Sequence, residues 1–359
     1  MVQYITDLCE ISELSTKEKE ELKEVTDQYS FKSNNYYLSL IDWDDPDDPI
    51  RRLIIPSRDE LTDWGELDPS NEEKYTVLRG LQHKYNSTAL LLVSNDCGGI
   101  CRYCFRKRIF IREQIESVED YQRAVDYIKE HKEITNVLLT GGDPLAISTE
   151  RLTGIISKLR EIEHVKIIRI GSKMVAYNPY RIIEDEELLD MISKYSRPER
   201  RIYIMTHFTH PRELSKTAVR GVNLLREAGA ALTNQTPMIN GINSDVDTLT
   251  ELFQKLSYSG IPPYYVFQCR PSSGNKQYSV PVEEALDVFE EACARVSGLA
   301  KRASFVMSHS SGKIQVIGKD DQYIYFKYRR AYRDEDSNKF IKARRNKEAY
   351  WLDDYEIVQ

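Results

Sequence analysis

The sequence predicts an α/β protein: an open, partial (β/α)6 barrel between an N-terminal, mainly helical extension and a C-terminal α+β extension. Two observations predict it. From about residue 88, apolar runs alternate with helical patterns, which is typical of parallel βαβ units. Residues suited to chemistry follow the predicted strands, as at the carboxyl-end face of α/β barrels. We therefore divide the chain into segments 1–87, 88–272 and 273–359.

The N-terminal segment is acidic and rich in tyrosine up to about residue 80. Ser15–Glu18 resembles a helix start, and Asp44–Pro49 indicates a loop between helical pieces. No long strand pattern appears there. We expect this segment to be mainly helical.

The central segment carries the alternation. Six strands are expected, at Ala89–Val93, Asn136–Leu139, Lys166–Ile170, Arg201–Met205, Ala231–Thr233 and Tyr264–Gln268. The helical patterns between them include Val118–Lys132, Thr149–Ile162, Thr217–Ala228 and Thr248–Ser259. Six units are too few for a closed eight-fold barrel, so an open one is predicted.

The C-terminal segment predicts a helix and short strands, followed by a polar tail. The helix is Pro281–Val296 and the strands are Ser304–Met307, Ile314–Ile317 and Tyr323–Tyr328. Basic residues gather in this part, at Arg329, Arg330, Arg333, Lys339, Lys342, Arg344 and Arg345. We interpret them as a solvated face interleaved with acids; the alternative is a docking patch for nucleic acid or protein.

The composition is that of a soluble globular protein, with 41% hydrophobic and 30% charged residues. A formal net charge of −7 disfavours binding to nucleic acid. No apolar run reaches the length of a membrane span, and the N-terminus lacks the layout of a signal peptide. A cytoplasmic location is expected, where thiols stay reduced.

Three of the six cysteines lie in one loop after the first predicted strand. Cys97, Cys101 and Cys104 have C-x3-C-x2-C spacing. Thiolates bind iron–sulfur clusters, zinc or copper, and a closed site needs four protein ligands. Three ligands on a [4Fe–4S] cluster leave one iron open, and an open iron can chelate S-adenosylmethionine (SAM) and pass an electron to its sulfonium. The alternative is a zinc site completed by His207 or Cys269.

The chain that carries this loop resembles the radical SAM superfamily. Leu139–Leu145 is similar to the superfamily's glycine-rich segment, in which Gly141, Gly142 and Asp143 would contact SAM. Over residues 35–318 the chain also resembles the lysine 2,3-aminomutase family. The matching segments include Cys97–Arg108, Leu139–Leu145, Arg169–Lys173, His207–Pro211, Asn234–Gln235, Gly241–Asn243 and Gly312–Ile314.

This resemblance implies an enzyme that moves an amino group from C2 to C3 of an amino acid with pyridoxal phosphate (PLP). It implies that Lys313 carries PLP and that Lys84 and Tyr85 bind the PLP phosphate. It places Arg106 on the substrate carboxylate. Ser172, His207 and Gln235 fall where family members contact SAM. The alternatives are a turn lysine at 313, a charged helix start at 106 and a hydrogen-bonded barrel histidine at 207.

The chain also departs from the lysine-acting members of the family. Those enzymes use two aspartates for the distant ammonium of the substrate, whereas Arg270 stands at one position and Met307–Ser310, at the other, has no acid. An arginine facing an ammonium is unfavourable by several kcal/mol. We expect glutamate or aspartate instead of lysine. Thr88 stands where the family's phosphate site has another arginine, which weakens the prediction of PLP.

Three functions therefore remain open. The first is a PLP-dependent 2,3-aminomutase acting on an acidic amino acid. The second is an enzyme of the same family that performs other radical chemistry without PLP on a different or larger substrate. The third is a non-enzymatic binding protein with a structural metal. The first two imply an electron donor such as flavodoxin or ferredoxin, and family members are commonly homo-oligomers.

Overall fold

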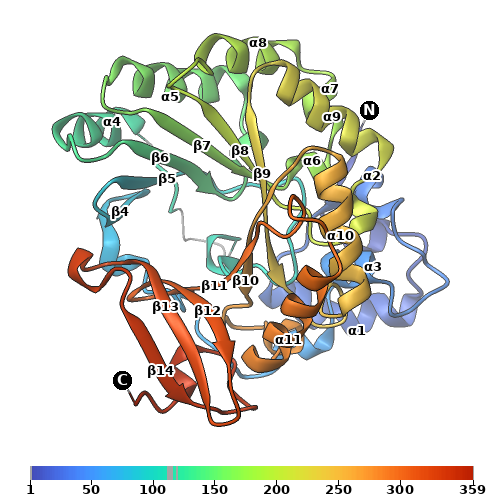
Figure 1. Cartoon of the computed structure of the whole chain (residues 1–359). Coiled ribbons are helices and arrows are strands. Elements are labelled where there is room, and N and C mark those ends of the chain that lie inside the picture. The colour runs from blue at the N-terminus through green and yellow to red at the C-terminus, as the bar shows by residue number, and fades with distance from the viewer. Residues whose placement is uncertain (1, 111–115, 119, 359) are drawn as a thin grey trace.

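The computed structural model describes residues 2–110, 116–118 and 120–358. One twelve-stranded sheet forms the body of the molecule, in the order β14-β13-β12-β11-β10-β9-β8-β7-β6-β5-β4-β3 (Figure 1). Its strands are β3 (Thr76–Leu78), β4 (Leu81–Tyr85), β5 (Thr88–Ser94), β6 (Asn136–Gly141), β7 (Ile167–Ser172), β8 (Ile202–Thr206), β9 (Ala231–Met238), β10 (Pro263–Gln268), β11 (Ser304–His309), β12 (Gly312–Lys319), β13 (Tyr323–Ala331) and β14 (Phe340–Arg344). A separate pair joins β1 (Tyr4–Ile5) to β2 (Ser33–Asn34).

The six predicted strands are confirmed as β5 to β10, and all pair in parallel. The structure adds a seventh: β11, predicted as a strand of the C-terminal extension, pairs in parallel with β10. Phe305, Val306 and Met307 on β11 are fully buried, as in a strand covered on both faces. The strands β12 to β14 then continue the sheet antiparallel.

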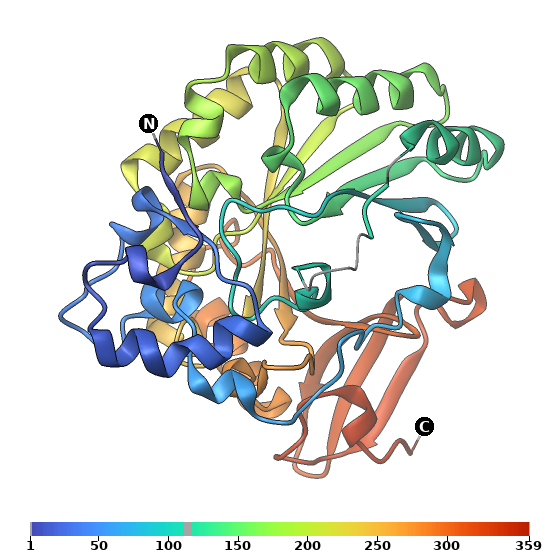
Figure 2. The ribbon, with the colours of Figure 1, turned by 180° about the vertical axis from the view of Figure 1, so that it is seen from behind.

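Helices cover the outer face of the sheet (Figures 1 and 2). They are α4 (Tyr121–Glu130), α5 (Thr149–Glu161), α6 (Met174–Tyr177), α7 (Tyr180–Ile183), α8 (Glu186–Tyr195), α9 (Lys216–Glu227), α10 (Val246–Tyr258) and α11 (Val282–Ala294). The helices of the N-terminal extension, α1 (Thr16–Gln28), α2 (Asn35–Leu38) and α3 (Pro49–Ile54), pack instead in a second apolar cluster with Tyr103 and Tyr177. The longer helices after β6 to β9 begin behind a side-chain cap: Ser148 before α5, Asp185 before α8, Ser215 before α9 and Asp245 before α10. In α5 the buried residues Leu152, Ile155 and Ile156 show the helical period that faces a core.

The prediction of a polar tail after Tyr328 is wrong in part. Phe340–Arg344 forms β14, which pairs antiparallel with β13 over five residues. Ala343 is fully buried on this strand, while Phe340 is exposed. Alternating lysine and arginine hid the strand because its outer face is solvated.

The two ends of the sheet approach each other. The Lys84 ammonium on β4 donates to the His309 carbonyl at 2.7 Å, and the Tyr75 hydroxyl donates to the Ser310 carbonyl at 2.5 Å. β4 consequently lies beside the turn between β11 and β12, and in both ribbon views it faces the C-terminal part of the sheet (Figures 1 and 2). Contacts between the two terminal extensions thus bridge the open side of the partial barrel. No helix among the described residues is long and apolar enough to cross a membrane.

Candidate active site

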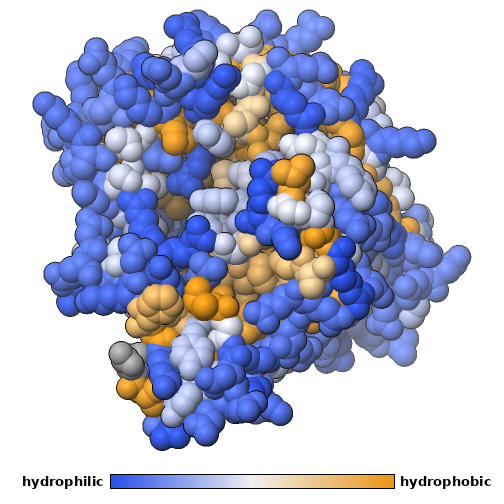
Figure 3. Space-filling model, viewed as in Figure 1, coloured by the Kyte–Doolittle hydropathy of each residue, from blue (hydrophilic) through white to orange (hydrophobic). Residues whose placement is uncertain are grey.

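One cavity of about 570 Å³ lies inside the curved sheet. Figure 3 shows the surface hollowed there, with hydrophilic residues around the recess. Every residue that the sequence nominated for a site lines this cavity: Lys84, Tyr85, Cys97, Cys101, Cys104, Arg106, Gly141, Gly142, Asp143, Ser172, His207, Gln235, Arg270 and Lys313. The structure therefore brings together residues that are dispersed along the chain.

The cysteine loop follows β5 and is anchored to the N-terminal extension. Arg102, between the second and third cysteines, is completely buried and forms two hydrogen bonds with the Glu60 carboxylate, at 2.9 and 2.8 Å. Lys107 contacts the same carboxylate at 3.2 Å. A buried charge of this kind requires its partner, so these contacts hold the loop in one place.

The three cysteines suit an iron–sulfur cluster better than one zinc ion. Burial raises the pKa of Cys104 to about 11 and that of Cys97 well above its usual range, so their thiolates need a metal as counter-charge. Three thiolates leave a zinc site one ligand short of four, whereas a [4Fe–4S] cluster held by three cysteines leaves one iron open.

The glycine-rich segment after β6 passes close to the cysteine loop. A Cβ on Gly142 would lie 2.3 Å from the Asp96 carbonyl oxygen, and Gly141 has a φ of +116°, so only glycine fits. The Asp143 carboxylate accepts hydrogen bonds from the backbone N–H groups of Lys173 and Met174 and from the Ser172 hydroxyl. Asp143 therefore ties the ends of β6 and β7 together.

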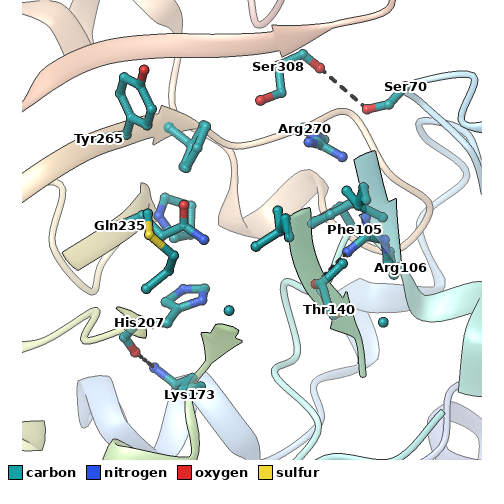
Figure 4. Close-up of a pocket in the computed structure, with 18 of the residues that line it drawn as sticks. Ser70, Phe105, Arg106, Thr140, Lys173, His207, Gln235, Tyr265, Arg270 and Ser308 are labelled. Carbon is teal, nitrogen blue, oxygen red and sulfur yellow. Dashed lines mark hydrogen bonds between the residues drawn. The ribbon is translucent and has the colours of Figure 1, made fainter. Parts of the chain in front are cut away.

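His207 and Gln235 line the cavity after β8 and on β9, across from Phe105 and Arg106 (Figure 4). Burial and the nearby Lys173 ammonium hold the pKa of His207 well below its usual range, so the ring is neutral. Its Nε2 atom lies 3.2 Å from the Tyr103 hydroxyl. The Lys173 ammonium donates to the His207 carbonyl at 3.0 Å. Thus His207 is held by hydrogen bonds and also faces the cavity.

Lys313, on β12, points its amine between two aromatic rings. Nζ lies 4.5 Å from the ring centroid of Tyr265 and 4.6 Å from that of Phe267. Burial, followed by the charges of Arg270 and Arg169, lowers the pKa of Lys313 well below its usual range. Desolvation next to other cations is the known way to obtain a neutral, nucleophilic lysine. This environment fits a lysine that condenses with the aldehyde of PLP.

Lys84 and Tyr85 lie at the end of β4, near Lys313. Burial, with the Arg270 charge as a second cause, lowers the pKa of Lys84 to about 8. Burial raises the pKa of Tyr85 to about 12. The guanidinium of Arg330, on β13, lies 4.9 Å from the Tyr85 ring. A cationic end of the cavity therefore adjoins Lys313.

Arg106 and Arg270 differ sharply in their partners. Arg106 donates from Nε and Nη2 to both oxygens of Glu72, at 3.1 and 2.7 Å. Burial opposes the charge of Glu72, yet Arg106 and Arg108 hold its pKa well below the usual range. Arg270 lies 3.7 Å from the Phe105 ring centroid, and its buried Nη1 has no hydrogen-bond partner. Burial lowers the pKa of Arg270 to about 10.

Several residues of this site escaped prediction from the sequence. They are Glu72, Arg169, Arg329 and Arg330, all of which line the cavity. Arg169 does lie in a segment that resembles the family, which was the one available signal. The interpretation of the C-terminal basic residues as a solvated face is wrong for Arg330, and Arg345 pairs with the buried Glu283 at 2.8 Å.

A three-cysteine loop at the carboxyl end of a parallel sheet, with a glycine-rich segment beside it, defines a radical SAM enzyme. The Radical SAM superfamily model matches residues 91–253. The chain is 51% identical to "Putative L-lysine 2,3-aminomutase" of Aquifex aeolicus, over 99% of this chain and 95% of that protein.

Two further relatives carry more specific names. Glutamate 2,3-aminomutase of Clostridioides difficile is 38% identical over 82% of this chain and 70% of its own length. L-Lysine 2,3-aminomutase of Clostridium subterminale is 36% identical over 83% and 71%. The chain belongs to the lysine 2,3-aminomutase family of radical SAM enzymes and is an isomerase of that family. This family uses a [4Fe–4S] cluster, SAM and PLP.

Proposed function

We propose that this enzyme moves the amino group of an acidic amino acid, glutamate or aspartate, from C2 to C3. The observation that carries the proposal is the Arg270 guanidinium, which faces the cavity with a buried and unpartnered Nη1. A buried donor without a partner is costly, and a carboxylate is its natural complement. Figure 4 shows Arg270 beside Phe105 and Arg106, across the cavity from His207 and Gln235.

Lysine does not suit this cavity. Among the described residues, the carboxylates that line it are those of Glu72 and Asp143. Glu72 is bound by Arg106 and Arg108, and Asp143 by backbone donors and Ser172. Neither is left to bind a distal ammonium, and Arg270 would repel one by several kcal/mol. The charge of the pocket thus favours an anionic side chain.

The cofactors are assigned to three groups of residues. Cys97, Cys101 and Cys104 would hold the cluster, and Lys313 with Lys84 and Tyr85 would hold PLP. The residues assigned to SAM are Gly141, Gly142, Asp143, Ser172, His207 and Gln235. When bound, the cluster and SAM supply a carbon radical, and PLP supplies an electron sink.

The chain's own residues bind, orient and shield the reactants. The neutral Lys313 amine can accept the PLP aldehyde without first losing a proton. Arg106 binds Glu72 through Nε and Nη2. The other edge of its guanidinium, formed by the two Nη atoms, would bind the substrate α-carboxylate; its Nη1 also donates to Thr140 at 3.3 Å. Glu72 would therefore position Arg106. The Tyr265 and Phe267 rings exclude water from Lys313.

The alternative of PLP-independent chemistry rested on the altered phosphate residues, with Thr88 where the family has an arginine, and on the altered substrate residues. In the structure, Arg330 donates to the Thr88 hydroxyl at 3.0 Å, so a guanidinium is present beside Thr88. This supports the PLP-dependent function over the alternative. It also leaves the acidic amino acid as the substrate class that the charges favour.

The test is an anaerobic assay of the reconstituted enzyme with SAM, PLP and reductant. Glutamate, aspartate, glutamine and lysine are compared as substrates, and the β-amino acid product is measured. We expect an acidic substrate to have the highest kcat/KM. Arg270→Gln should lower it by about 100-fold, because truncating one partner of a buried charge pair costs about 2 to 5 kcal/mol. Arg333→Gln, an exposed control, should leave it unchanged. Preferential conversion of lysine would overturn the proposal.

A further inference from the structure

We propose that Arg330, with the hydroxyls of Ser87 and Thr88, binds the phosphate of PLP and that the bound phosphate joins the two ends of the sheet. The inference rests on the proposed function, because it requires PLP at Lys313. Arg330 lies on β13 in the C-terminal extension, beyond residues 35–318, over which the sequence motifs resemble the family. Nothing in the cysteine or glycine motifs points to it.

The register of the sheet places Arg330 beside Lys313. The two residues are direct partners across the antiparallel pair of β12 and β13. Side chains of such partners lie on the same face of a sheet, with Cβ atoms about 4.5 to 5.5 Å apart. The aldehyde and phosphate-bearing groups of PLP are attached to adjacent ring atoms. The lysine that takes the aldehyde therefore needs its phosphate-binding cation close by.

The donors around Arg330 are arranged for an anion. Its Nη1 donates to Thr88 Oγ1 at 3.0 Å and its Nη2 to Ser87 Oγ at 2.7 Å. Since both hydroxyls accept from Arg330, their own O–H groups remain available to donate. Of the five guanidinium N–H groups, two are used in these contacts. The remaining donors and the two hydroxyls together suit a phosphate group.

The charge balance points the same way. Among the described residues, no carboxylate pairs with Arg330 within 4.0 Å, whereas Lys84, Arg169 and Arg329 line the same cavity. Lys84 and Arg169 each depress the pKa of Lys313, so their positive charge is felt at the amine. A phosphate carrying about −2 charge at pH 7 compensates this excess. A neutral ligand would not.

The contact between Arg330 and Thr88 also explains how this chain can have a threonine at a position where the family has an arginine. Arg330 reaches across the open side of the partial barrel, from β13 to the turn between β4 and β5, and supplies a guanidinium where the local sequence has only a hydroxyl. A phosphate held by both sides would link the first and last parts of the sheet. Binding of PLP should therefore stabilise the whole fold, beyond its local effect on β12.

The experiment compares PLP with pyridoxal, which has the aldehyde but no phosphate. The affinity of each is measured from the absorbance of the lysine adduct, in wild type, Arg330→Gln, Arg330→Lys and the matched control Arg333→Gln. We expect Arg330→Gln to weaken PLP at least 30-fold and pyridoxal less than threefold. The affinity of Arg330→Lys for PLP should lie between those of wild type and Arg330→Gln, because lysine keeps the positive charge and loses the paired N–H donors of the guanidinium. Arg333→Gln should match wild type.

Thermal unfolding with and without PLP gives a second readout. The increase in Tm on adding PLP should be largely lost in Arg330→Gln and kept in Arg333→Gln. Equal weakening of PLP and pyridoxal, or none, would overturn the role of Arg330 and leave Lys313 as the PLP lysine. Absence of any adduct in wild type, or an adduct that survives Lys313→Ala, would overturn the assignment of PLP to Lys313 and this inference with it.

Discussion

Arg102 and Glu60 form a buried bidentate ion pair, with side chains 1% and 0% exposed, that joins the cysteine loop to the N-terminal extension. Such a pair contributes little net stability compared with an apolar contact, but removal of one partner is strongly destabilising. The cysteine loop therefore depends on a carboxylate far from it in the sequence.

Glu60→Gln should lower the free energy of unfolding by about 3 to 5 kcal/mol, because it leaves Arg102 buried without a counter-charge. Chemical denaturation under anaerobic conditions measures the change. Glu24→Gln is the control, since Glu24 pairs with Arg58 at an exposed site, where side chains are 69% and 63% accessible; its effect should stay within about 1 kcal/mol. Equal effects of the two variants would contradict the prediction.

Tyr177→Phe should lower the reduction potential of the bound cluster and leave its iron content unchanged. The Tyr177 hydroxyl donates to Cys101 Sγ at 3.0 Å, and hydrogen bonds to cluster sulfurs are one determinant of cluster potential. Loss of this hydrogen bond disfavours the reduced cluster, which carries one more negative charge than the oxidised cluster. A redox titration followed by electron paramagnetic resonance measures the shift. Tyr180→Phe serves as the control and should show no shift, because the Tyr180 ring packs edge-to-face against Tyr36.

Gly142→Ala should impair SAM cleavage and destabilise the fold by about 1 to 3 kcal/mol, the usual effect of overpacking. The added methyl would lie 2.3 Å from a backbone oxygen that cannot rotate away. At Gly171 the nearest atom would be 3.7 Å away, so Gly171→Ala should be close to neutral. Release of 5′-deoxyadenosine and thermal unfolding are the two measurements. If both variants behave alike, the close-approach argument is wrong.

The affinity for PLP should fall as the pH rises through about 8. Burial lowers the pKa of Lys84 to about 8, so its positive charge is present below that pH and lost above it. The phosphate, with a second pKa of about 6, stays dianionic throughout. Lys84→Met should remove the step, while the exposed control Lys74→Met should keep it. Pyridoxal, without a phosphate, should show no step from Lys84 in a parallel titration.

The sequence predicted the parallel core well because each strand has a fully buried outer face, and the inner face, which lines the cavity, is largely covered. Ala89–Val93 and Lys166–Ile170 read as continuous apolar or alternating runs, and β5 and β7 match them within one or two residues. The cysteine loop and the glycine segment are local patterns, so their place after β5 and β6 could be predicted from spacing alone. No long-range information was needed for either.

Long-range pairings could not be predicted. Glu72 binds Arg106 across 34 positions, and Arg330 reaches Thr88 across 242; neither has a local signal. The N-terminal segment 1–87 also contributes β3 and β4 to the sheet, which its polar sequence did not indicate. Such contacts depend on how the ends of the sheet curve toward each other.

The bridge between the two ends of the sheet has a consequence for biosynthesis. Translation delivers the cysteine loop and the glycine segment well before β12 and β13 leave the ribosome. A nascent chain can thus present its three cysteines for cluster assembly before Lys313 and Arg330, the residues proposed to bind PLP, have been synthesised. We expect maturation to be ordered: iron and sulfide are inserted first, and PLP binds last, once β12 and β13 have joined the sheet.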